Sequence, residues 1–161
     1  MKAIMISIRP RHVADILNHK KLVEIRKTFP KEFLNQQNGY TVYIYCTKQC
    51  SLARLNNGSW NDTFITEKEI NEDNFKRMYS GYDGKGKVVA KFKLNRIGIV
   101  SPLSTKYWHQ EACLSEEELE AYLNGEQGYA WCIDDLEIFE MPKDIKGKAP
   151  QSWCYVEDSY E

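Results

Sequence analysis

Residues 9–31 hold a cluster of basic side chains whose spacing suits the binding of phosphate groups. The cluster consists of Arg9, Arg11, His12, His19, Lys20, Lys21, Arg26, Lys27 and Lys31. Apolar residues lie between them and would fix the backbone, so that the charged groups are held in place rather than freely solvated. Each phosphate that such a cluster contacts releases counterions and adds an attraction that does not depend on sequence. This segment is therefore the first candidate for a functional site.

Two residues of this segment also suit the recognition of a nucleobase. Glu24 lies two residues before Arg26, so on a strand both side chains project from the same face. A carboxylate beside a guanidinium can hold it in place and present a hydrogen-bonding edge to a base. The alternative is an ordinary exposed ion pair, which would contribute little to stability. The sequence leaves both interpretations open.

The same segment resembles the signature of the ASCH domain family, a branch of the PUA-like superfamily. That signature reads Gly-x-Lys-x-x-Glu-x-Arg where a helix passes into a strand. Lys21, Glu24 and Arg26 match it, and His19 stands at the glycine position. Two further segments resemble phage and Gram-positive bacterial members, namely Ser7-Ile8-Arg9-Pro10 and Ala149-Pro150-Gln151-Ser152-Trp153. The resemblance covers nearly the whole chain and is weakest over residues 50–80.

The resemblance implies a module that binds RNA or a modified nucleobase, with a role in RNA metabolism or translation-linked regulation. The ligand would lie in a cleft beside the helix-to-strand segment. Together with the aromatic residues considered below, the candidate ligand-binding residues are Ser7, Arg9, Lys21, Glu24, Arg26, Tyr45, Ser152 and Trp153.

The resemblance also implies an alternative function. Some family members are amidohydrolases that remove an acyl group from N4-acetylcytidine, with a lysine, a threonine three residues later and a glutamate further along. Lys21 matches the lysine, Glu24 stands at the threonine position, and Glu111 is the candidate for the later glutamate. A carboxylate is not equivalent to a threonine nucleophile, but with Lys21 it would orient a water molecule. Whether the chain is an enzyme is left open.

Aromatic side chains supply a second element of nucleic-acid binding. An unpaired base stacked on one contributes about 1–3 kcal/mol. The candidates are Tyr43, Tyr45, Trp60, Trp108, Trp131 and Trp153. Most aromatic residues in strands belong to the core. Trp153 follows the Gln151-Ser152 pair, and we expect it to line the cleft.

The distribution of charge is more informative than its total. The net charge is −1, but residues 1–110 carry +10 and residues 111–161 carry −11. This asymmetry suits a polyanion bound to the basic part, or an acidic part that pairs with and screens the basic part. A third possibility is a protein–protein adaptor of a phage or bacterium, in which the acidic segment Glu116–Glu120 contacts a basic partner.

No pattern indicates a metal or a cofactor. The cysteines are odd in number and irregularly spaced, so we expect reduced thiols rather than a zinc site; they are Cys46, Cys50, Cys113, Cys132 and Cys154. The glycine-rich segment 81–86 lacks the features of a phosphate-binding loop. No apolar run approaches the ~18–20 residues of a membrane helix, and no signal peptide is evident. We expect one cytoplasmic domain over residues 1–161, with its oligomeric state undetermined.

The elements that must position these residues follow from the hydrophobic pattern, which predicts an α+β fold. Strands are expected over residues 3–8, 22–27, 40–47, 87–100, 129–139 and 152–156, and helices over 10–19, 70–78 and 116–123. Thr66–Glu69 and Ser115–Glu118 match capping boxes, whereas residues 48–63 are polar. Short strands with inserted helices suggest a sheet curled toward a barrel. The resemblance implies a small PUA-like barrel of five to six strands with flanking helices.

Overall fold

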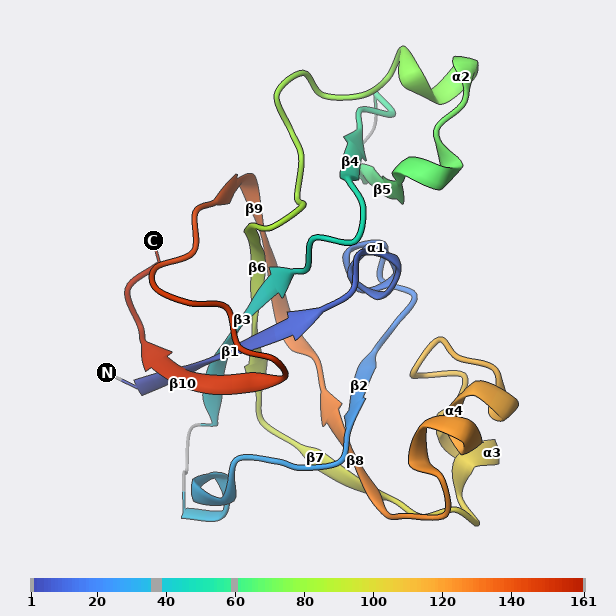
Figure 1. Cartoon of the computed structure of the whole chain (residues 1–161), viewed down its shortest axis with the longest axis vertical. Coiled ribbons are helices and arrows are strands. Elements are labelled where there is room, and N and C mark those ends of the chain that lie inside the picture. Colours follow the sequence, from blue (N-terminus) through green and yellow to red (C-terminus); the bar gives the residue numbers. More distant parts are fainter. Residues whose placement is uncertain (1, 36–38, 59–60, 161) are drawn as a thin grey trace.

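A five-stranded sheet forms the centre of the protein (Figure 1). The structure is a computed structural model that describes residues 2–35, 39–58 and 61–160. β1 and β3 run parallel, and the other neighbouring strands run antiparallel. In spatial order the strands are β10 (Trp153–Glu157), β1 (Lys2–Ile8), β3 (Tyr40–Cys46), β6 (Val88–Leu94) and β9 (Asp134–Lys143).

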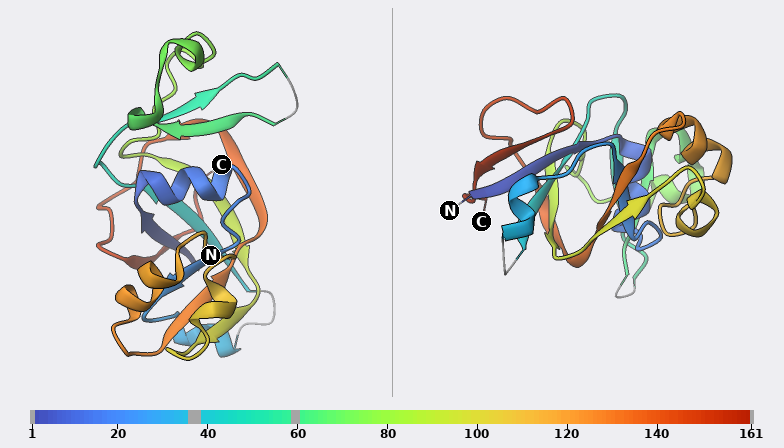
Figure 2. Two further views of the ribbon diagram at one scale, coloured as in Figure 1. Left: turned by 90° about the vertical axis from the view of Figure 1, so that its right-hand side faces the viewer. Right: turned by 90° about the horizontal axis from the view of Figure 1, so that it is seen from below.

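Two smaller sheets and several short helices surround this sheet. The second sheet has the order β2 (Val23–Arg26), β8 (Gly128–Cys132), β7 (Ile97–Val100), and a hairpin joins β4 (Leu52–Leu55) to β5 (Thr63–Thr66). The helices are α1 (Pro10–Leu17), α2 (Glu72–Phe75), α3 (Thr105–Trp108) and α4 (Glu116–Leu123), with 3₁₀ helices η1 (Lys31–Asn35) and η2 (Glu67–Glu69). Figure 2 shows α1 between the hairpin with α2 at one end and α3 with α4 at the other.

The apolar character of β1 and β3 follows from their position in the sheet, which is covered on both faces. Ile4 and Ile6 lie in one buried cluster with Val13 of α1. On the opposite face, Met5 of β1 packs in a cluster closed by Tyr160 near the C-terminus. A strand buried on both faces must be apolar at nearly every position. The strands predicted over residues 3–8 and 40–47 are confirmed.

The second sheet orients the residues that carry the expected chemistry. Val23 and Ile25 of β2 are buried in a cluster with Leu119 and Leu123 of α4. Because side chains alternate along a strand, this packing turns Glu24 to the opposite face of β2. Helix α4 therefore fixes the direction in which β2 presents its charged residues.

Two of the predicted strands are wrong in extent, because each is divided between two sheets. Residues 87–100 form β6 and β7, and residues 129–139 form β8 and the start of β9. The two segments cross from one sheet to the other at the same place, where Cys132 N donates to Arg96 O at 3.1 Å. The Arg96 guanidinium pairs with Asp134 there at 2.9 Å, and Asp135 adopts a φ of 51°. The residue types along these two segments gave no sign that the backbone passes from one sheet to another.

The helix predicted over residues 70–78 is also wrong in extent. The box that begins at Thr66 caps only the three-residue η2, and a second box, from Asn71 to Asn74, starts α2, which ends at Phe75. The polar segment 48–63 contains β4, which the sequence prediction missed. The other capping box is confirmed: Ser115 Oγ accepts from Glu118 N at 3.0 Å at the start of α4.

The α+β class is confirmed, but the barrel is not. Within the described residues the strands form three separate sheets, and none of them closes on itself by hydrogen bonding. The described residues also include no helix long and apolar enough to span a bilayer.

Candidate functional site

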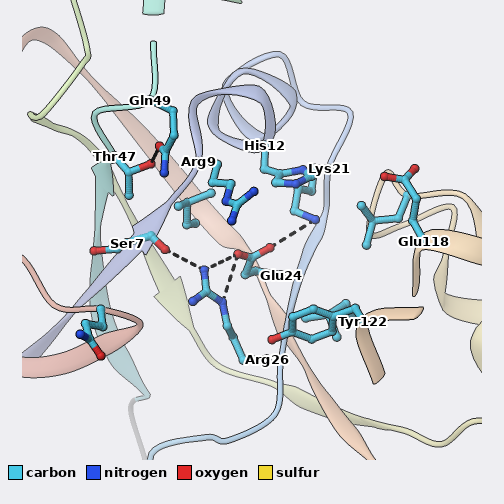
Figure 3. A pocket seen from close by; sticks show the side chains of 14 residues that line it. Ser7, Arg9, His12, Lys21, Glu24, Arg26, Thr47, Gln49, Glu118 and Tyr122 are labelled. Carbon is cyan, nitrogen blue, oxygen red and sulfur yellow. Dashed lines mark hydrogen bonds and ion pairs between the residues drawn. The ribbon is translucent and has the colours of Figure 1, made fainter. Parts of the chain in front are cut away.

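A cavity of about 510 Å³ lies where the end of β1, the start of α1 and strand β2 meet α4 (Figure 3). Its volume falls within the range of about 300–1,000 Å³ that is usual for small-molecule sites. Five of the residues that were predicted to bind a ligand line it, namely Ser7, Arg9, Lys21, Glu24 and Arg26. The remaining polar or aromatic residues of the lining are His12, Thr47, Gln49, Glu118, Tyr122 and Gln151.

A buried network of charges forms one wall of the cavity. The Glu24 side chain lies between two cations, with Oε1 at 3.3 Å from Lys21 Nζ and Oε2 at 2.7 Å from Arg26 Nη2. Lys21 Nζ also donates to the carbonyl oxygen of Ala112. Lys21 and Glu24 are only 2% and 7% exposed, so the interpretation of this group as an ordinary surface pair is wrong.

Arg26 connects this network to the central sheet. Its Nη2 donates to the carbonyl oxygen of Ser7 at 2.8 Å, and its Nη1 donates to Ser152 Oγ at 3.0 Å. Ser7 in turn donates from Oγ to the carbonyl oxygen of Pro150 at 2.7 Å. One guanidinium therefore holds β2, the end of β1 and the segment before β10 together.

The two cations decide the charge of Glu24. Burial by itself would raise the pKa of this carboxyl group, but Lys21 and Arg26 lower the pKa below its usual value. Glu24 therefore stays ionised at neutral pH. The network as a whole carries one net positive charge, because two cations surround one carboxylate.

The turn between α1 and β2 places Lys21 in this network. His19 has a φ of 62°, the left-handed conformation that glycine adopts most easily. The backbone N–H groups of Lys20 and Lys21 both donate to the carbonyl oxygen of Asp15, at 2.9 and 3.0 Å. Thus the turn remains tight although histidine replaces the glycine of the signature.

His12 belongs to the cavity, although the sequence analysis counted it only as a member of the basic cluster. Its Nδ1 atom is buried and has no hydrogen-bond partner among the described residues. Burial and then the charge of Lys21 lower the pKa of His12, so its imidazole is neutral at pH 7. The sequence spacing could have indicated this position, because His12 lies three residues after Arg9 and both are therefore on one side of the first turn of α1.

Four predicted site residues do not line the cavity, namely Tyr45, Trp153, Glu111 and Ser152. Tyr45 is buried on the other face of the central sheet, in the cluster that contains Met5. Trp153 packs edge-on against Trp131 at 5.6 Å between ring centres, and its Nε1 donates to Thr28 Oγ1. Glu111 is exposed, and only its backbone is near the site, because its carbonyl oxygen accepts from the N–H groups that begin the β2 segment.

Two further candidates from the sequence are Ser152 and Trp60. Ser152 lies outside the lining and contacts the site only through Arg26. Trp60 lies outside the described residues. Of the aromatic residues, it is Tyr122 of α4 that lines the cavity, with 43% of its surface exposed.

The described residues include no group of three or more histidine, cysteine, aspartate or glutamate side chains that could hold a metal ion. All five cysteines are free thiols, and Cys46 is buried. Burial raises the pKa of the Cys46 thiol to about 12, so this group is not reactive at neutral pH.

Solved structures of known proteins identify the fold. No family model matches the chain, and no curated protein matches it. The crystal structure of an ASCH protein from Zymomonas mobilis superimposes with a TM-score of 0.64 at 18% identity, over 97% of this chain and 88% of that one. Two single-substitution variants of that protein give TM-scores of 0.63 and 0.64 at 17% and 18% identity, over 97% and 98% of this chain and 89% and 92% of theirs.

The chain therefore has the ASCH fold, which confirms at the level of fold the resemblance found in the sequence. The closer resemblance to phage and Gram-positive bacterial members stays a prediction.

The buried network leads to a prediction about stability. Glu24→Gln is expected to lower the free energy of unfolding by about 3–5 kcal/mol, because it leaves the buried Lys21 and the partly buried Arg26 without a counter-charge. Urea denaturation measures this change. The double variant Lys21→Met/Glu24→Gln should lose less than the sum of the two single variants, because the second change removes one of the stranded cations. A loss below about 1 kcal/mol in Glu24→Gln, as for an exposed pair, would contradict this account.

The lowered pKa of His12 leads to a prediction about pH. The unfolded chain protonates this histidine near its ordinary pKa of 6.5, whereas the folded chain does so only at lower pH. The neutral imidazole therefore favours the folded state above about pH 6.5, and stability falls as the pH drops below it. His12→Gln should flatten the curve of unfolding free energy against pH below about pH 6.5. Parallel curves for wild type and His12→Gln would refute the assignment.

Proposed function

We propose that this ASCH-fold chain is a binding module that holds one unpaired nucleobase, in an RNA strand or in a modified nucleoside, in the cavity between α1 and α4. The observation that carries this proposal is the combination of one fixed charged wall, uncommitted amide groups and an aromatic ring around a single cavity. Each of these three parts supports a different aspect of base recognition.

Two glutamine side chains provide hydrogen-bonding groups that the protein itself does not use. Gln49 accepts a hydrogen bond from Thr47 through Oε1, which leaves its NH₂ group available. The Gln151 side chain has no hydrogen bond within the described part of the chain. A carboxamide offers a donor and an acceptor side by side, the arrangement that pairs with the edge of a base.

The charged wall supports recognition because its groups are already in place. Both oxygens of Glu24 and three nitrogens of Arg26 are engaged within the protein. Side chains that are held in this way lose little conformational entropy when a ligand binds. The wall therefore serves as a preorganised polar edge rather than as a set of mobile phosphate-binding groups.

Tyr122 provides a partly exposed aromatic ring at the cavity. It projects from α4 and lies beside Arg26 of the charged network (Figure 3). An unpaired base that enters the cavity can stack on this ring, which contributes about 1–3 kcal/mol irrespective of the base.

The proposal predicts that Tyr122→Leu weakens binding by roughly 5- to 150-fold, because it removes the stacking surface. Isothermal titration calorimetry at low salt with cytidine, adenosine and a short single-stranded RNA measures this change. Tyr107→Leu is the matched control, because Tyr107 is 71% exposed on α3 and does not line the cavity. The proposal fails if the wild type binds none of these probes, or if the two leucine variants weaken binding equally.

A second candidate function is the hydrolysis of an acylated nucleoside. The observation in its favour is that Lys21 Nζ and Glu24 Oε1 lie 3.3 Å apart at the cavity wall, next to the neutral imidazole of His12. Against it, the oxygens of Glu24 are already paired with two cations, and Glu111 does not line the cavity. Binding without turnover is thus the better-supported function.

Turnover of N4-acetylcytidine separates the two candidates. In this reaction water adds to the amide carbonyl, the bond to N4 breaks, and acetate and cytidine leave. If the chain is a hydrolase, Lys21→Met abolishes the release of cytidine while circular dichroism shows a folded protein. If purified wild-type protein releases no cytidine, the hydrolase is ruled out and the binding module remains.

A further inference from the structure

The two sides of the cavity differ in charge. Arg9, at the junction of β1 and α1, lies on one side with Thr47 and Gln49, and Glu118 of α4 lies on the other (Figure 3). The Lys21, Glu24 and Arg26 network lies between them. A ligand that carries a charged group would therefore enter in one orientation rather than the other.

Arg9 differs from the other cations around the cavity in having no partner. It is exposed, and within the described residues its guanidinium makes no hydrogen bond or ion pair. By contrast, Lys21 and Arg26 are bound to Glu24, and Arg11 pairs with Glu118 at 3.3 Å. Arg9 is therefore the cation of the lining whose charge is available to a ligand.

Ion pairs with the acidic part of the chain compensate some of the remaining positive charge of the basic part. Residues before 111 pair with residues after it in Lys27–Glu126, Lys87–Asp144, Lys91–Glu137 and Arg96–Asp134. The acidic part thus pairs with some of the basic residues but, within the described part of the chain, leaves the guanidinium of Arg9 free at the cavity.

The helix that follows Arg9 adds to the positive potential at this side. Arg9 occupies the N-cap position of the eight-residue α1, its side chain makes no capping bond, and the first turn contains no acidic residue. The peptide dipoles of a helix leave partial positive charge at its N-terminus. Here that charge supplements the guanidinium of Arg9, and no acidic residue in that turn compensates it.

We propose that Arg9 binds a phosphate group of the ligand, so that the cavity takes a nucleotide in preference to the corresponding nucleoside. This inference rests on the proposed function and adds to it the chemical class and the orientation of the ligand. A phosphate monoester carries about −1.5 to −2 charges at pH 7, which the free guanidinium and the net positive network can match. The phosphate lies at Arg9, and the base points toward Tyr122.

Glu118 reinforces this orientation. It lies beside Tyr122 on α4, where Glu116 and Glu117 occupy the same first turn. A phosphate placed at that side would approach the three carboxylates of this turn, of which Arg11 pairs with Glu118 alone, whereas an uncharged base would not be repelled. The reverse orientation is therefore disfavoured by repulsion as well as by the loss of the contact with Arg9.

Calorimetric titration with cytidine, its 5′- and 3′-monophosphates and inorganic phosphate tests the inference. The wild type should bind one of the monophosphates at least about tenfold more tightly than cytidine, the usual gain from a charge-assisted hydrogen bond. This preference should shrink as salt is added. Arg9→Gln should abolish the preference, whereas Lys68→Gln, which removes one charge from the exposed 3₁₀ helix η2, should keep it.

The other outcomes are also decisive. Equal affinity for cytidine and its monophosphates, or a preference that survives in Arg9→Gln, overturns the phosphate site and leaves the nucleobase site intact. Binding of inorganic phosphate as tightly as of the monophosphates overturns the assignment to a nucleotide. If none of these probes binds, the proposed function fails together with the inference.

Discussion

A carboxylate that is withdrawn from water must be compensated by nearby cations, and the buried Glu24 imposes this constraint on the whole site. Its two oxygens require Lys21 from the turn after α1 and Arg26 from the end of β2. Through Ala112 and Ser7, these two cations reach the segment before α4 and the end of β1. One charge thus connects the parts of the chain that surround the cavity, which explains why the cavity has a fixed polar wall.

The sequence was sufficient for features that depend on near neighbours. Alternation along a strand correctly placed Glu24 and Arg26 on one face, and the spacing of Ser115 and Glu118 correctly located the start of α4. The apolar runs of β1 and β3 were recognised because strands buried on both faces have a distinctive composition. The basic segment could be singled out from its composition, but the burial of Lys21 and Glu24 could not be predicted.

The features that were missed depend on which distant segments meet. Thr47 and Gln49 reach the cavity because β1 and β3 run parallel and end at the same edge, as the bond from Thr47 N to Ile8 O shows. Tyr45 was assigned to the cleft on residue type, and Trp153 because it follows the Gln151-Ser152 pair in a segment that resembles the family, but each packs against a neighbouring element instead. Likewise, the sequence could not show which opposite charges of the two parts of the chain pair with each other, nor that Arg9 is the cation of the lining without a partner among the described residues.

The central claim, that the cavity between α1 and α4 is the ligand site, is tested most directly by mapping backbone amide chemical shifts by NMR while a cytidine monophosphate is added. The account predicts that the shifts concentrate at Arg9, His12, Gln49, Tyr122 and Gln151, which line the cavity but belong to distant parts of the chain. Shifts confined to the β4–β5 hairpin and α2, or no shifts at any concentration of nucleotide, would contradict it.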